Sequence, residues 1–220
     1  VHLMKNQIFR RLLEHLLVEN KEEIAKRSFK HCHVVGLHSI MLLESPGKTI
    51  RMYFTDKDHE MWKNHQKSIL RNTMPLSLGV HPHHCNLTFQ ALTPDVFNMH
   101  VYNVNYKTGN EFELQEFLYH SPLKDKKGSF KYQGTKLFQS LFVEEFQIDR
   151  PKKMLANQLH TVYVPMDKET AWLVFEGKED LAYKPFCYSN HDLEKFDFTG
   201  MYQPMDWSEI TQAIEKYTGK

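Results

Sequence analysis

The sequence predicts an all-β core, an antiparallel sandwich or barrel, with helices at both ends of the chain. Between residues 34 and 178, short runs of β-branched and aromatic residues alternate with turn-forming residues. In this region one stretch, around residues 58–70, has the pattern of a helix. Because strands and helices do not alternate, the pattern excludes a doubly wound parallel sheet.

The segment 1–33 is predicted to be helical. Apolar residues recur at helical spacing from Ile8 to Leu17, with charged residues between them. Asn20 followed by Glu23 has the spacing of a capping box, in which both side chains satisfy backbone N–H groups at a helix start. A second helix is therefore expected from this point to about Lys30.

The β domain, 34–178, contains nine predicted strands separated by turn signals. The strands are expected at residues 34–43, 49–54, 76–81, 86–92, 96–104, 112–119, 136–146, 158–164 and 171–175. The turn signals between them include Ser45-Pro46-Gly47, Thr93-Pro94-Asp95, Thr108-Gly109-Asn110 and Lys126-Lys127-Gly128.

The segment 179–220 is predicted to be a tail and a helix packed on the barrel. Residues 181–204 are rich in aromatic and turn residues, which indicates an ordered tail lying on the sheets. Asp206 with Glu209 again has capping-box spacing. The helix that follows has one apolar stripe and ends near Gly219; the stripe contains Trp207, Ile210, Ala213, Ile214 and Tyr217.

The overall composition excludes several classes of partner. The net charge of +1 gives no electrostatic case for nucleic acid or an anionic membrane. No apolar run approaches the roughly 18 residues of a membrane-spanning helix. Three cysteines, Cys32, Cys85 and Cys187, cannot all pair and form no CxxC motif, which favours a reduced, cytoplasmic protein.

His81 and His83 are the most informative residues, because side chains two apart on a strand share a face. The same parity continues through Cys85, Leu87 and Phe89, which are apolar, whereas the opposite face carries His84, Asn86, Thr88 and Gln90. The pair is therefore expected on the buried face of its strand. Two buried imidazoles need a bonding or coordinating partner, since burying an unsatisfied polar group costs free energy.

His160, about 80 residues later, opens another predicted strand and is the candidate third ligand. Histidine nitrogens suit a borderline divalent metal such as iron(II), zinc, copper, nickel or manganese. Three protein ligands leave open coordination positions, which a catalytic site needs and a structural site does not. A pair of hydrogen-bonded histidines on a barrel wall, with His160 at a sheet edge, is the alternative interpretation.

An HxH pair followed by a lone histidine at a strand start resembles the cupin superfamily. The passage from His81 to Leu87 is similar to its first motif, and His160-Thr161-Val162, with the run from Ala171 to Gly177 after it, is similar to the second. The resemblance spans about residues 34–178 and implies a cupin-type double-stranded β-helix, or jelly roll, with N-terminal and C-terminal helices.

The chain departs from the usual cupin ligand set. Many cupins place a glutamate five to seven residues after the pair, where this chain has Thr88, Phe89 and Gln90. The second motif lacks its Pro-x-Gly turn, and Val164 stands where the family has asparagine. The remaining three-histidine set is similar to that of the thiol dioxygenases, which hold iron(II) with three histidines and add both atoms of O₂ to a thiol sulfur. The resemblance therefore favours iron(II), with zinc, nickel or manganese as alternatives.

Further candidates for the pocket each have an alternative structural role. His100 could orient a ligand imidazole or be an ordinary sheet histidine, and Cys85 could lie near the metal or be a small buried apolar residue. Gln90, Tyr102 and Trp172 are pocket candidates, although aromatic residues most often belong to the core. Four glutamates on predicted strands are candidates for a fourth ligand, or are ordinary exposed strand residues: Glu113, Glu116, Glu144 and Glu145.

The first functional hypothesis is a metal-dependent cupin enzyme, a non-haem iron(II) oxygenase acting on a small molecule through His81, His83 and His160. A second keeps the metal without redox chemistry, as a zinc, nickel or manganese isomerase, epimerase or hydrolase. A third is a non-catalytic jelly-roll binding or assembly module, in which the histidines are structural and the helical ends mediate oligomerisation. Cupins are often dimeric, so a homodimer is compatible with each of these hypotheses.

Overall fold

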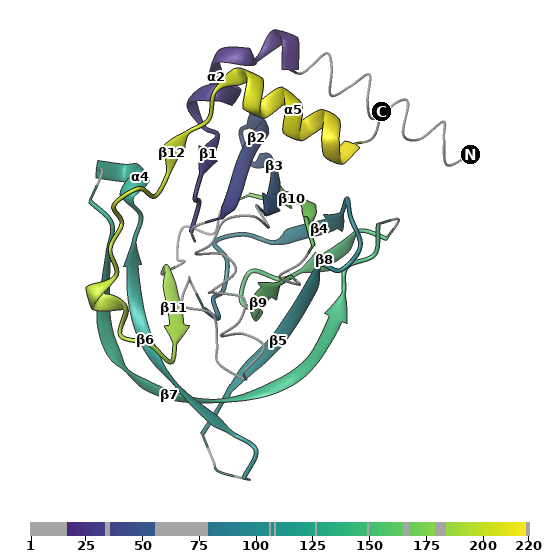
Figure 1. The fold of residues 1–220 in the computed structure, drawn as a ribbon. Helices are drawn as coiled ribbons and strands as arrows, with labels where there is room; N and C mark the ends of the chain where they lie inside the picture. Colours follow the sequence, from purple (N-terminus) through teal and green to yellow (C-terminus); the bar gives the residue numbers. More distant parts are fainter. Residues whose placement is uncertain are drawn as a thin grey trace.

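The structure is a computed structural model, and it describes residues 17–33, 36–55, 79–105, 107, 109–125, 127–148, 150–164, 168–178 and 184–218. Within these residues the strands form two antiparallel sheets (Figure 1). The seven-stranded sheet has the order β12-β1-β2-β3-β10-β4-β8, and the five-stranded sheet has the order β11-β6-β7-β5-β9. The predicted all-β class is thereby confirmed.

The elements have the following bounds. The seven-stranded sheet contains β1 (Phe29–Lys30), β2 (Leu37–Ser45), β3 (Lys48–Thr55), β4 (Leu87–Ala91), β8 (Lys152–Met154), β10 (Ala171–Glu176) and β12 (Gln203–Pro204). The five-stranded sheet contains β5 (Phe97–Val104), β6 (Phe112–His120), β7 (Ser129–Glu145), β9 (Leu159–Tyr163) and β11 (Phe186–Ser189). The helical elements are α2 (Lys21–Lys26), α4 (Pro122–Asp125), the 3₁₀ turn η1 (Leu193–Lys195) and α5 (Trp207–Thr218).

The seven-stranded sheet is apolar on both faces, because neighbouring side chains of a strand point to opposite sides. On β3, Met52 belongs to the cluster beneath the helices, which includes Ile24 of α2 and Ile210 of α5. Tyr53, the next residue, points to the other face of the sheet and packs there against the apolar cluster that contains Trp172. Figure 1 shows α2 and α5 lying over the end of the molecule that carries β1, β2 and β3. The helices therefore cover one face and leave the other to the interior between the sheets.

Eight of the nine predicted strands agree with the structure in position but differ in extent. The strand predicted at 136–146 begins earlier, at Ser129, and β7 runs as one curved strand along the five-stranded sheet (Figure 1). Residues 76–78 lie outside the described residues, and the rest of that predicted strand, Gly79 to His81, forms only isolated bridges. The short strands β1, β8, β11 and β12 were not predicted.

The helix predictions are confirmed at the C-terminus and corrected near the N-terminus. In α5, the Asp206 N–H donates to the Glu209 carboxylate at 2.8 Å, which is one half of the expected capping box. In α2, Asn20 occupies the N-cap but makes no side-chain capping bond, and the helix ends at Lys26 rather than near Lys30. The reason is strand pairing, because Phe29 and Lys30 join the sheet opposite β12. The helix predicted at 58–70, and most of that predicted between Ile8 and Leu17, lie outside the described residues.

A membrane-spanning helix is not found in the described part of the chain, where every helix is too short or too polar to cross a bilayer.

Candidate metal centre

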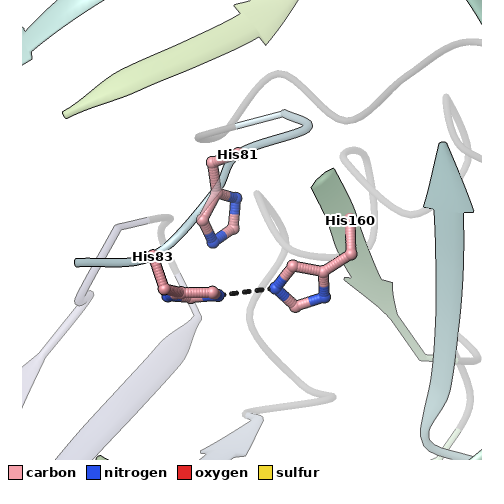
Figure 2. A group of neighbouring side chains, drawn as sticks. All are labelled: His81, His83 and His160. Atoms are coloured by element: carbon pink, nitrogen blue, oxygen red, sulfur yellow. Dashed lines mark hydrogen bonds between the residues drawn. The ribbon is translucent and has the colours of Figure 1, made fainter. Parts of the chain in front are cut away.

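His81, His83 and His160 lie together in the interior (Figure 2). Each offers one ring nitrogen, and the three nitrogen atoms lie within 4.8 Å of one another. His81 and His83 are half-buried, whereas His160 is 1% exposed. The prediction that the fold brings His160 alongside the pair is therefore supported by the geometry.

Backbone pairing holds the two parts of the cluster together. The His81 N–H donates to the His160 carbonyl at 3.0 Å, and the His160 N–H donates to the His81 carbonyl at 3.2 Å. One residue earlier in the chain, Val80 exchanges the same two bonds with Tyr188 of β11, at 3.0 and 2.8 Å. The segment carrying His81 is thus clamped between β9 and β11, which fixes where its imidazole can lie.

The alternation of faces that was expected to run from His81 through His83 to Phe89 does not belong to one strand, and this part of the prediction is wrong. His83 lies outside any strand, and a bend at His84 and Cys85 separates it from β4. This bend turns the chain so that the imidazoles of His81 and His83 both approach His160. Alternation along a single strand does not by itself bring them there. The parity within β4 itself is confirmed, because Leu87 and Phe89 are buried and Cys85 is 1% exposed.

The three imidazoles lie close enough together to be a candidate site for a divalent metal. The Nε2 atoms of His83 and His160 share a hydrogen bond at 2.6 Å, whereas two nitrogens bound to a metal at about 2.1 Å and at right angles would be separated by about 3 Å. His81 keeps its Nδ1 within 3.2 Å of the Gly79 carbonyl oxygen, which accepts a bond from Nδ1–H and leaves Nε2 free to coordinate. Neutral imidazole is the form that binds metal.

Burial favours that neutral form. Burial lowers the pKa of His160 well below its usual value, and the neighbouring His81, His83 and His100 lower it further. The pKa of His83 is lowered well below its usual value by burial and by His81, His84 and His33. Burial also lowers the pKa of His81. The site therefore contains neutral nitrogen donors over the physiological pH range, ready for a cation.

A chain of polar side chains extends from His160 to the surface. Its Nδ1 lies 2.6 Å from the Asn98 Oδ1, and the Asn98 Nδ2 lies 2.9 Å from His100 Nε2. Glu144 then accepts from His100 at 3.1 Å and from Lys152 at 2.9 Å. Burial raises the pKa of Glu144, but the bonds from Lys152 and His100 outweigh it and leave that pKa lowered.

Through this series of contacts His100 is linked to His160 by way of Asn98 rather than directly. Asn98 was not predicted as a site residue. It lies two residues before His100 on β5, so both share a face, and the register that places His100 opposite His160 brings Asn98 beside the same imidazole. The signal in the sequence was this i, i+2 pair, but it is informative only once the pairing of β5 with β9 is known.

The aromatic candidates divide between the interior and the surface. Phe89 contacts both His83 and His160, with ring centroids 6.4 and 5.6 Å away. Trp172 is buried and stacks on Tyr53 at 5.8 Å, in the same apolar cluster as Phe89 and Cys85. Tyr102 is 36% exposed and bonds to Gln139 on the outside of the sheet, so it does not line the centre.

The remaining candidates lie away from the three histidines. Gln90 is on the opposite face of β4 from Phe89 and donates to the Ile148 carbonyl oxygen at 3.2 Å. Among the four strand carboxylates, Glu144 comes nearest, through His100 and Asn98. Glu116 instead bonds to Lys136 and Tyr188, Glu145 to the Asp95 N–H, and Glu113 lies near Lys107. The described residues therefore place no carboxylate within the three-histidine group.

The fold and the site together define a two-sheet antiparallel β protein with an interior three-histidine group. No protein-family model matches the chain, and no curated protein matches it. Among solved structures, the polyketide cyclase RemF from Streptomyces resistomycificus is 8% identical, with a TM-score of 0.34 over 80% of this chain and 87% of its own. This identity and this TM-score are too low to assign either a fold family or a function to the chain.

Proposed function

We propose that this protein is a metal-dependent enzyme of the cupin type, in which His81, His83 and His160 hold one divalent metal. The observation that carries the proposal is the convergence of three imidazole nitrogens within 4.8 Å in the interior of a two-sheet β protein. Three neutral ligands leave coordination positions for other molecules, which is the arrangement of catalytic rather than structural sites.

The reaction we propose is an iron(II)-dependent oxygenation of a small molecule. Iron(II) is favoured because an all-histidine set without a carboxylate is similar to that of the thiol dioxygenases. When bound, the metal would supply the redox chemistry that protein side chains lack. The protein's own contribution is to orient and to exclude water: Phe89 covers one side of His83 and His160, and it stacks on Phe146 at 5.0 Å.

Asn98 and His100 hold the ligand set in its binding form. By accepting the Nδ1 proton of His160, the Asn98 carbonyl oxygen leaves Nε2 as the lone-pair donor directed toward His83. Such outer partners fix the tautomer and ring orientation of a metal ligand. The set is therefore preorganised before the metal enters.

Oxygen consumption tests the proposal. Protein reconstituted with iron(II) under anaerobic conditions is mixed with a panel of small thiols and other small molecules, and O₂ uptake is followed with an electrode. We expect substrate-dependent uptake with iron and none with the zinc-loaded protein, because zinc cannot change oxidation state.

The outcomes of the same experiment separate the competing functions. Equal O₂ uptake with iron and zinc, or none with any compound, would contradict an oxygenase. Activity of zinc, nickel or manganese protein on the same panel without O₂ would favour a non-redox isomerase, epimerase or hydrolase. A protein that binds none of these metals would be better described as a jelly-roll binding or assembly module.

A further inference from the structure

A second set of polar side chains, which are half-buried, is not explained by metal binding. Tyr202, in the C-terminal tail, has its hydroxyl 3.0 Å from Nδ1 of His33. The same hydroxyl lies 2.9 Å from the hydroxyl of Tyr119 on β6. Tyr119 also hydrogen-bonds to Ser121, where β6 ends. These groups form an unbroken hydrogen-bonded line: His33, Tyr202, Tyr119 and Ser121.

The inner end of this line is close to the candidate metal centre. His33 stacks on Tyr53, with ring centroids 6.4 Å apart, and Tyr53 belongs to the apolar cluster that contains Phe89. His33 is near enough to His81 and His83 for their charges to interact. Burial lowers the pKa of His33 to about 3, so its ring is neutral and has one N–H and one lone pair.

The backbone around the line is strained, which indicates that its geometry is specified. His31, His33 and Tyr202 have φ values of 54°, 68° and 54°, in the left-handed region that side-chain-bearing residues rarely adopt. The Tyr202 N–H donates to the His31 carbonyl oxygen at 3.2 Å and ties the two strained segments together. Residues with side chains are strained in this region and persist there where the surrounding structure enforces them, most often at functional sites.

We propose that His33, Tyr202 and Tyr119 form a proton path between the three-histidine site and the surface, used when a protic ligand binds there as its anion. The proposal rests on the proposed function, since it needs a metal at the three histidines. The ligand class is a small molecule with an acidic O–H or S–H group that must be lost on binding.

The proton movement balances along the line. The ligand X–H bond breaks as His33 Nε2 gains the proton, and His33 Nδ1–H passes its proton to the Tyr202 oxygen. Tyr202 in turn passes its hydroxyl proton to Tyr119, and Tyr119 releases its own to water near Ser121. Each residue loses one proton and gains one, so none changes charge overall. The buried groups therefore stay neutral. Because the proton of His33 has moved from Nδ1 to Nε2, the starting arrangement is restored by rotation of the hydroxyls together with a flip of the His33 ring.

Ligand association measured by stopped flow tests this path. Cobalt(II)-loaded protein, which has a visible spectrum, is mixed with acetohydroxamic acid, a protic ligand, or with azide, which is already an anion. Tyr202→Phe removes the middle hydroxyl and keeps the ring, and His33→Gln removes the ring base. Tyr102→Phe makes the same chemical change as Tyr202→Phe, on the outer face of the five-stranded sheet.

We expect both variants, Tyr202→Phe and His33→Gln, to slow the association of acetohydroxamic acid by at least about 100-fold, the lower end of the effect of a positioned acid–base group. Azide association and cobalt content should stay unchanged. Added imidazole should restore part of the rate in His33→Gln, and Tyr102→Phe should behave as wild type. Unchanged acetohydroxamic acid rates, or equal slowing of both ligands, would overturn the proton path while leaving the metal site intact. A wild-type chain that binds no cobalt would overturn the proposed function itself, and the proton path with it.

Discussion

The side chain of Asn98 decides which nitrogen of His160 can bind a metal. With its oxygen toward His160, the amide accepts from Nδ1–H at 2.6 Å and leaves Nε2 without a proton. In the reversed orientation the amide nitrogen would donate to Nδ1, the proton would sit on Nε2, and this nitrogen could not coordinate. In the same orientation Nδ2 lies 2.9 Å from Nε2 of His100.

Replacing this amide should weaken metal binding in a way that depends on its oxygen. Asn98→Ala should reduce affinity by about 10–100-fold, the usual effect of losing an outer partner, whereas Asn98→Asp, which can only accept, should retain most of the affinity. Competition with a chromophoric chelator measures both. Asn103→Ala, at an exposed position on the same strand, is the control. Equal affinity of Asn98→Ala and wild type would show that the amide does not fix the tautomer.

At the level of secondary structure, the position of His81 depends on the close approach of the Gly79 segment to β11. Gly79 has φ of 47°, and a Cβ at this position would lie 1.9 Å from the Tyr188 carbonyl oxygen. No side chain fits there without displacing β11. The bridge from Val80 to Tyr188, and with it the placement of His81 opposite His160, therefore requires glycine at this position.

Gly79→Ala should consequently lower both stability and metal content. We expect a loss of at least about 2 kcal/mol in the free energy of unfolding, in the range of severe steric substitutions, and the loss of stoichiometric metal. Gly109→Ala separates backbone strain from the clash, since Gly109 has φ of 104° and an added Cβ there would meet nothing within 4 Å. It should cost about 1–2 kcal/mol, the strain of a side-chain-bearing residue at positive φ, and keep its metal. Similar losses in the two variants would show that the contact with Tyr188 is unimportant.

The elements show where sequence reasoning succeeds and where it stops. Alternation in β4 correctly predicted that Leu87 and Phe89 face the interior, because burial follows local parity. The strand β11 was not predicted, since four residues within a tail carry no usable period. Its pairing with β6 is set by contacts between residues about 70 positions apart. The helix end expected near Lys30 was wrong for a related reason, because tertiary pairing of Phe29 ended the helix early.

Across the whole molecule, the interior is built around histidines that stay neutral. Burial lowers the pKa of His33 to about 3, and it also lowers the pKa of His81, His83 and His160. These residues come from the N-terminal segment, the loop before β4, and β9. The sequence predicted three of them as candidate ligands, His81 and His83 from strand parity and His160 from its place in a later strand. The line from His33 to Tyr202 joins residues 169 positions apart and needed the tertiary structure.

The metal-free protein should therefore lose stability as the pH falls. In the unfolded chain these histidines take up protons near pH 6.5, whereas in the native state they do so only at lower pH, so protonation favours unfolding. Each contributes a slope of about 1.4 kcal/mol per pH unit, beginning below pH 6.5 and, for His33, continuing to about pH 3. Urea unfolding at several pH values measures this slope, which should be smaller in His33→Phe. A stability that is flat between pH 7 and 5 would contradict the neutral interior.

The central claim is that the three histidines hold one metal, and metal content per chain tests it most directly. Elemental analysis is made after iron(II) reconstitution of the wild type, of the double variant His81→Ala/His83→Ala, and of His84→Ala as a neighbouring-histidine control, with folding checked by circular dichroism. We predict close to one iron per chain in the wild type and in His84→Ala, and almost none in the folded double variant. Equal metal in all three proteins, or no metal in the wild type, would contradict the account.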